Sequence, residues 1–287
     1  MRKKALCIGI NDYGHMPCPE WNIPDMNMRG AVNDAYAWAN LLVRHHDFSA
    51  ADIELLLDAD ATRANILRKF KELIAGSRQG DVLVFTNSSH GTLTPDVSGD
   101  EEEIDIEVFG RHFKGRFDQA ICPYDYPKLV IDDEMKEISD SVGDGVNLTI
   151  IADNCFSGTL TDFKPSPAEV RKYSTLRGPK LILLSGSSDR QLSGDLRPDE
   201  SKNRYNWHGF MTYNAVETIK DAYDAGHRLT YAEWHEKILD RIKNSDDPTY
   251  DKYRDQQPQL EAKEEDKQLY VFSTERAKAK GIRKSAG

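Results

Sequence analysis

Short runs of apolar residues alternate along this chain with longer segments of helical periodicity, and this alternation is the feature that most limits the possible folds. It is typical of α/β folds, in which helices connect the strands of a mainly parallel sheet. The runs are rich in Val, Ile and Leu, as expected for strands buried on both faces. The predicted strands are residues 5–10, 53–57, 82–87, 119–122, 148–153 and 181–185.

Helices are predicted between and after these strands. Asn33 is a candidate N-cap for the first helix, and Thr62 is a candidate N-cap for the second, which would end near Gly76. Residues 132–134 (DDE) would open a third helix, and two more lie between residues 208 and 244. Their apolar stripes predict core packing rather than a cofactor site.

Two segments carry no sustained period. Residues 91–117 are rich in Asp, Glu and Gly, and residues 159–179 contain three prolines among polar side chains. The second segment is predicted to be an exposed linker. It would divide a single domain of 287 residues into a larger part (1–158) and a smaller part (180–273), followed by a disordered basic tail (274–287).

The net charge of −10 argues against a nucleic-acid partner, which would favour a basic surface. No apolar run approaches the roughly 20 residues that cross a bilayer, and the first apolar run is too short for a signal peptide. We therefore expect a cytoplasmic protein without a membrane partner. The four cysteines are widely spaced, which favours neither a disulfide framework nor a zinc site.

Two of the predicted strands end in polar sequences that could carry chemistry. Residues 88–92 (SSHGT) follow one strand, and residues 153–158 (DNCFSG) end another. Because the carboxyl ends of parallel strands meet at one edge of a sheet, His90 and Cys155 could come within hydrogen-bond reach. A histidine beside a cysteine is the arrangement that activates a thiolate nucleophile. Either residue alone would more often be structural, but the pair in glycine-containing turns is more specific.

These two segments resemble the catalytic motifs of caspase-like cysteine peptidases, and the chain is most similar to bacterial type I metacaspases without a prodomain. The resemblance implies a caspase-like three-layer α/β/α sandwich around a mainly parallel central sheet. Other segments match in the same order along the chain: residues 5–11 (ALCIGIN), 30–35 (GAVNDA), 121–125 (ICPYD), 131–134 (IDDE), 185–189 (SGSSD), 209–213 (GFMTY) and 257–260 (QPQL).

Three positions depart from the family pattern. Asn154 and Phe156 stand where metacaspases more usually carry Ser and His, and Ser89 stands where Gly is usual. The caspase signature QAC[RQG]G is absent, so the chain is not a true caspase.

The resemblance also implies a mechanism and a specificity. Cys155 would attack as a thiolate, His90 would protonate the leaving amine, and the N–H groups of Gly91 and Cys155 would form the oxyanion hole. The family's first substrate pocket corresponds to Asp34, Ser88 and Asp153. Two carboxylates there favour substrates with Arg or Lys before the cleaved bond. Basic residues in the linker (Lys164, Arg171, Lys172 and Arg177) are candidate self-cleavage sites.

No cofactor is required for this chemistry, but many metacaspases need calcium as an activator. The matching carboxylates are Asp132, Asp133 and Asp162, with Asp105 a poorer match. Calcium takes six to eight oxygen ligands, so carbonyls and water would complete such a site. The alternative for the pair at 132 and 133 is a helix N-terminus.

Two other interpretations remain open. Clostripain-like and gingipain-like peptidases share this fold and also cut after basic residues, although residues 30–34 and the pair Asp132-Asp133 favour the metacaspase branch. A catalytically weak or inactive interaction module is an alternative of a different class. The expected partners are protein or peptide substrates, and the expected state is a monomer.

Overall fold

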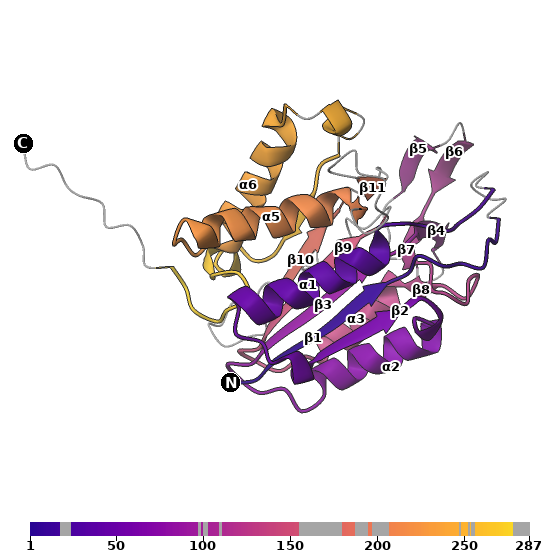
Figure 1. The fold of residues 1–287 in the computed structure, drawn as a ribbon. Helices are drawn as coiled ribbons and strands as arrows, with labels where there is room; N and C mark the ends of the chain where they lie inside the picture. Colours follow the sequence, from indigo (N-terminus) through magenta and orange to yellow (C-terminus); the bar gives the residue numbers. More distant parts are fainter. Residues whose placement is uncertain are drawn as a thin grey trace, which may run out of the picture.

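A six-stranded sheet forms the centre of the molecule (Figure 1). The computed structural model describes residues 1–17, 24–96, 99, 103–108, 111–154, 180–186, 195–196, 207–246, 248–251, 253 and 256–277. The strands of the sheet are β1 (Lys3–Gly9), β2 (Ile53–Leu57), β3 (Val82–Ser88), β9 (Asn147–Asp153), β10 (Lys180–Ser185) and β13 (Gln259–Glu261). Their order is β13-β10-β9-β3-β1-β2, and every neighbouring pair is parallel except β10 and β13.

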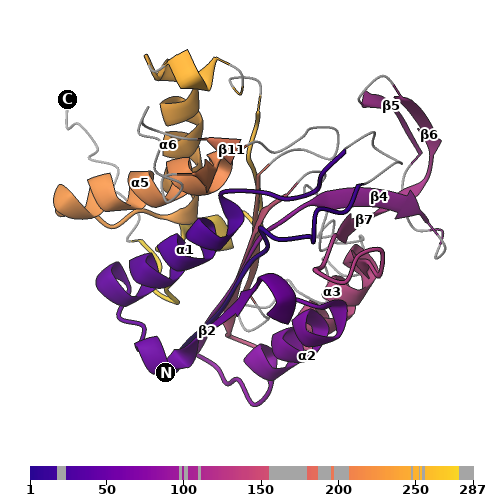
Figure 2. The same cartoon turned by 45° about the vertical axis from the view of Figure 1, so that its right-hand side comes forward.

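Helices cover both faces of this sheet (Figures 1 and 2). One face carries α1 (Ala31–His45), α5 (Phe210–Asp224) and α6 (Tyr231–Asn244), and the other carries α2 (Arg63–Ile74) and α3 (Asp132–Asp140). Successive side chains of β1 alternate between the two cores, because strand side chains point to opposite faces in turn. The predicted three-layer α/β/α fold is therefore confirmed.

One predicted strand lies outside the central sheet. Residues 119–122 fall largely in β7 (Phe117–Ile121), which pairs antiparallel with β4 (Gly91–Pro95) and β8 (Val130–Ile131). The assignment of this run to the parallel sheet was wrong, because a short apolar run does not specify its strand partner. β13 was not predicted as a strand, since it has only three residues and is only partly buried.

The segment without periodicity, residues 91–117, also contains strands. Besides β4 it forms a hairpin of β5 (Ile104–Val108) and β6 (Arg111–Gly115), which projects from the body of the molecule (Figure 2). Asp105, His112 and Lys114 on this hairpin are exposed. The sequence of β5 (IDIEV) does alternate apolar and acidic residues, but five residues are too short for a sustained period.

The start of α1 differs from the prediction, whereas the start of α2 agrees with it. Thr62 caps α2 and its Oγ1 accepts a hydrogen bond from Asn65 N–H at 3.3 Å. In α1 the N-cap is Gly30, so the assignment of Asn33 as the cap was wrong. The side-chain amide of Asn33 instead donates to the carbonyl of Trp207 at 2.8 Å, a contact between distant segments.

The chain remains ordered past the predicted start of the tail at residue 274. Tyr270 N–H donates to the carbonyl of Glu275 at 2.9 Å, and Ala277 N–H donates to the carbonyl of Gln268 at 3.1 Å. The remaining tail, 278–287, and the predicted linker, 159–179, lie outside the described residues. Within the part of the chain that the structure describes, no helix is both long and apolar enough to cross a membrane.

Gly9, at the end of β1, tests how closely α1 approaches the sheet. A methyl group on Gly9 would lie 2.3 Å from the carbonyl oxygen of Ala31 and 2.8 Å from the Cα of Val32, and neither backbone atom can yield without moving the helix. We expect Gly9→Ala to lower the free energy of unfolding by about 1–3 kcal/mol in urea denaturation.

The matched control is Gly143→Ala, where the nearest atom would be the Ser77 carbonyl oxygen at 3.8 Å. We expect this change to be neutral or stabilising by up to about 1 kcal/mol. Equal unfolding midpoints for the two variants would contradict the close approach.

Candidate active site

Two neighbouring strands of the central sheet end in register beside each other. In the β3–β9 pair, Ser88 lies opposite Asp153. His90 stands two residues beyond Ser88, and Cys155 stands two residues beyond Asp153. Cys155 itself lies outside the described residues, so its approach to His90 stays a prediction. The matched register means that the two turns leave the sheet from adjacent positions.

The imidazole of His90 is held in one orientation by its surroundings. Its Nε2 lies 2.7 Å from the carbonyl oxygen of Met26. A carbonyl can only accept a hydrogen bond, so Nε2 carries the proton of the neutral ring and Nδ1 keeps its lone pair. The backbone is fixed as well, because His90 N–H donates to the hydroxyl of Tyr13 at 3.2 Å and Cys122 N–H donates to the His90 carbonyl at 2.9 Å.

Burial lowers the pKa of His90 below the usual value of 6.5, because a charged imidazolium loses hydration there. The hydrogen bond to Met26 acts in the opposite direction but is the smaller influence. The ring is therefore neutral at pH 7 and suited to act as a base through Nδ1.

A buried amide links the ends of the two strands just before these turns. Asn87, near the end of β3, donates through Nδ2 to Ser89 Oγ at 2.9 Å and to Asn154 Oδ1 at 3.3 Å. Ser89 and Asn154 are two of the three positions that depart from the family pattern, and they bind the same side chain. These two departures thus form one connected group with Asn87 that holds the strand ends together.

Two buried carboxylates lie beside the strand ends. Asp34 is fully buried, and its Oδ2 accepts hydrogen bonds from Ser88 Oγ at 2.6 Å and from Gly209 N–H at 2.9 Å. Asp153, only 3% exposed, accepts a hydrogen bond from Thr212 N–H at 2.8 Å. A methyl group on Gly209 would lie 2.2 Å from Asp153 Oδ2 and 2.8 Å from Asp34 Oδ2. Both carboxylates therefore lie directly against Gly209.

We call Asp34, Ser88, Asp153, His208 and Gly209 the carboxylate cluster. The structure brings the three predicted pocket residues together in it, but it leaves neither carboxylate facing solvent. His208 was not singled out from the sequence, although its Nδ1 lies 2.9 Å from Asp34 Oδ1. Tyr13 and Met26 were also missed, because contacts to the turn at His90 leave no local sequence signal.

The candidate calcium ligands do not form one group in the described residues. Asp132 is buried at the start of α3, where its oxygens accept hydrogen bonds from Gln119 N–H at 2.8 Å and from Asp133 N–H at 3.0 Å. Asp105 lies on the β5–β6 hairpin and pairs with His112 and Lys114. Asp162 lies outside the described residues. Among those that are described, no three His, Cys, Asp or Glu side chains are grouped as metal ligands.

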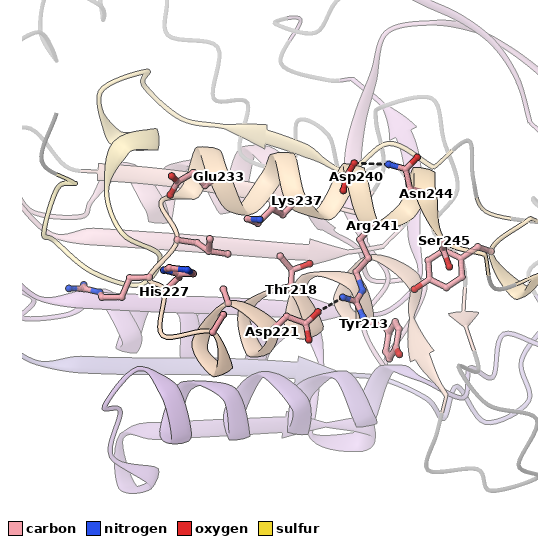
Figure 3. A pocket seen from close by; sticks show the side chains of 15 residues that line it. Tyr213, Thr218, Asp221, His227, Glu233, Lys237, Asp240, Arg241, Asn244 and Ser245 are labelled. Carbon is pink, nitrogen blue, oxygen red and sulfur yellow. Dashed lines mark hydrogen bonds and ion pairs between the residues drawn. The ribbon is translucent and has the colours of Figure 1, made fainter. Parts of the chain in front are cut away.

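A separate pocket of about 790 Å³ lies between α5 and α6 (Figure 3). Polar groups on its walls pair with one another, since Arg241 forms an ion pair with Asp221 at 2.6 Å and the amide of Asn244 donates to Asp240 at 2.6 Å. Neither His90 nor the carboxylate cluster lines this pocket. The pocket is therefore a polar gap between two helices and is separate from the candidate active site.

Comparisons with known proteins show which family the chain resembles. Residues 3–164 match the family model described as metacaspase, peptidase C14 domain. Metacaspase-4 of Arabidopsis thaliana is 35% identical over 167 residues, which cover 56% of this chain and 35% of that protein. Metacaspase-1 of Kluyveromyces lactis is 32% identical over 199 residues, which cover 66% of this chain and 40% of that protein. The chain thus matches 35–40% of the length of these relatives.

A crystal structure of a Geobacter sulfurreducens protein shares the fold. It superposes with a TM-score of 0.61 at 21% sequence identity, and the match covers 91% of this chain and 93% of that one. At this identity the likeness concerns the fold alone.

His90 and His15 should titrate on opposite sides of pH 6.5. Burial lowers the pKa of His90, whereas the hydrogen bond and charge of Asp25 raise the pKa of the exposed His15. Imidazole signals followed by NMR in the Cys155→Ala chain, where no thiolate acts on His90, should show His15 protonating first as pH falls. Protonation of His90 before His15 would contradict the buried, neutral base.

Proposed function

The chain belongs to the metacaspase family, peptidase C14, and from this premise we propose that it is a cysteine endopeptidase cutting after arginine or lysine. The observation that carries the proposal is the matched register of β3 and β9, with an oriented neutral His90 beyond the end of β3. In the sequence, Cys155 follows the end of β9 by two residues, as His90 follows the end of β3. We place it with the bacterial type I metacaspases, on the segments at residues 30–35 and 131–134.

The chemistry uses two side chains. Nδ1 of His90 accepts the thiol proton of Cys155, and the resulting thiolate attacks the carbonyl carbon of the scissile bond. The imidazolium then gives its proton to the leaving amine, which leaves an acyl group on the sulfur. A water molecule, deprotonated by His90, hydrolyses this thioester and regenerates the thiol. The Met26 carbonyl keeps the Nε2 proton in place throughout.

The oxyanion of each tetrahedral intermediate is assigned to the N–H groups of Gly91 and Cys155. Gly91 opens β4 directly after His90, so the donor and the base belong to the same turn. Removal of one such donor typically lowers kcat by about 10²–10³.

The specificity rests on charge. Asp34 and Asp153 are two carboxylates in one buried corner, where mutual repulsion and lost hydration favour the arrival of a cation. An arginine side chain suits the corner better than lysine, because its planar fork can bond two carboxylate oxygens at once. The substrates are therefore proteins or peptides with a basic residue before the cleaved bond.

Calcium is proposed as an activator, with no part in the bond-breaking steps. Asp132 and Asp133 are adjacent carboxylates and carboxylate oxygens are suitable ligands, although both oxygens of Asp132 already accept hydrogen bonds. Asp162 is the third proposed ligand, whereas Asp105 fits less well because it pairs with His112.

An interaction module on the same fold is the second candidate. One observation favours it: both pocket carboxylates are buried, at 0% exposure for Asp34 and 3% for Asp153. A peptidase must open this corner, whereas a module need not.

Peptides ending in Arg, Lys or Asp before a fluorogenic group separate these candidates. We expect cleavage after Arg and Lys that disappears in Cys155→Ala and in His90→Ala. Asp153→Asn should lower kcat/KM for the Arg peptide by at least about 30-fold, because it removes one charge of a buried pair. Cleavage only after Asp would refute the specificity, and no cleavage of any peptide would favour the module.

The calcium requirement and self-cleavage are both tested by measuring the intact mass of the chain. With calcium present, we expect cuts after Lys164, Arg171, Lys172 or Arg177, and Asp133→Asn should raise the calcium concentration needed. The control is Asp140→Asn, at the exposed end of the same helix. A chain that stays whole while it cuts peptides would rule out self-cleavage, and equal calcium requirements in both variants would rule out Asp133 as a ligand.

A further inference from the structure

We propose that His208 is a gate of the carboxylate cluster: its imidazole occupies Asp34 in the free protein and yields that position to the basic side chain of the substrate. This inference rests on the proposed function and extends it to a residue outside the matching segments. The contact between His208 and Asp34 joins residues 174 positions apart in the chain.

The two carboxylate oxygens of Asp34 accept different numbers of hydrogen bonds. Oδ2 accepts two hydrogen bonds, from Ser88 Oγ at 2.6 Å and from Gly209 N–H at 2.9 Å, which use its two lone pairs. Oδ1 accepts one, from Nδ1 of His208 at 2.9 Å. An incoming cation must therefore approach Oδ1, the oxygen that the imidazole holds.

Among the hydrogen-bond partners of the Asp34 carboxylate, His208 is the most exposed to solvent. Asp34 has no exposed surface, and Ser88 and Gly209 are buried as well. The side chain of His208 keeps 22% of its surface exposed. Of the residues that bond Asp34 in the described part of the chain, His208 is thus the one that a substrate meets first.

The backbone around His208 is fixed, so the side chain is the part that can move. A methyl group on Gly30 would lie 2.8–3.0 Å from backbone atoms of His208, which shows how tightly α1 packs there. Asn33 holds the Trp207 carbonyl at 2.8 Å, and Asp34 holds the Gly209 N–H. Rotation about the side-chain torsions of His208 opens the cluster without disturbing these bonds, and such rotations are fast.

The gate lowers the affinity for arginine and lysine alike. Either side chain must replace the hydrogen bond that His208 gives to Asp34, and the free-energy cost of turning the imidazole away does not depend on which cation arrives. The preference for arginine comes from the carboxylates themselves, because a guanidinium can bond Asp34 Oδ1 and Asp153 together, whereas an ammonium is a single point charge. Removal of the imidazole therefore strengthens the binding of both side chains by the same factor.

The experiment compares His208→Ala with the parent chain on paired Arg and Lys peptides. Loss of a hydrogen bond to a charged carboxylate corresponds to about tenfold or more in binding, so we expect KM to fall at least about tenfold for both peptides. The preference for Arg in kcat/KM should stay unchanged, because both substrates displace the same bond. A purely structural role would raise both KM values, and unchanged or raised values would overturn the gate.

Two further variants guard against misfolding. His208→Asn keeps an N–H donor near the place of Nδ1 and should keep both KM values near those of the parent chain. His235→Ala removes an imidazole of α6 that contacts the Pro258 carbonyl at 2.8 Å, and should leave both KM values unchanged. If His235→Ala lowers both KM values as much as His208→Ala does, the gate is refuted.

A binding measurement separates the gate from the proposed peptidase activity. In the Cys155→Ala chain, calorimetry with Nα-acetyl-arginine amide and its lysine counterpart should show tighter binding after His208→Ala, by the same factor for both probes. The imidazole signal of His208 should shift when either probe binds. Absence of Cys155-dependent cleavage would refute the peptidase, whereas equal probe affinities in both chains would refute the gate.

Discussion

The hydrogen bonds of the buried Asp34 carboxylate hold together parts of the fold that are far apart in sequence. Asp34 lies in the first turn of α1, Ser88 ends β3, and His208 and Gly209 precede α5. A buried carboxylate is stable only when donors surround it, so each partner must be in place before the corner can close. The close approach of Gly30 to His208 serves the same end, because a side chain there would push α1 away.

Much of the framework was predictable because it depends on local pattern. The strands of the parallel sheet can be recognised in the sequence as apolar runs. The polar residues that follow them indicate the edge of the sheet where His90 and Asp153 lie. The pairing of β7 was not predictable in this way, since neighbours of a short strand are set by tertiary packing. Tyr13 and Met26 were missed for a related reason. Met26 contacts His90 through a backbone carbonyl that any residue supplies, and the hydroxyl of Tyr13 reaches His90 from a segment 77 positions away in the chain.

The positions that depart from the family pattern show a further limit of single-sequence reasoning. Ser89 and Asn154 each look like an isolated change next to a catalytic candidate. In the structure both bind Nδ2 of Asn87, so the side chains at three positions form one hydrogen-bonded unit inside the protein. Polar groups buried in this way stabilise each other, and replacing one member removes a hydrogen bond from its neighbours. The meaning of such a change lies in the group and not in the single residue.

The pairing of β9 with β10 has a consequence for chain continuity. These strands flank the long segment between residues 154 and 180, yet they are hydrogen-bonded in parallel from Asn147 and Lys180 to Ala152 and Ser185. Strands from both sides of that segment thus belong to one sheet and share its cores. A backbone break within it would yield two polypeptides that stay associated as a nicked particle, visible on a denaturing gel but not by its hydrodynamic size.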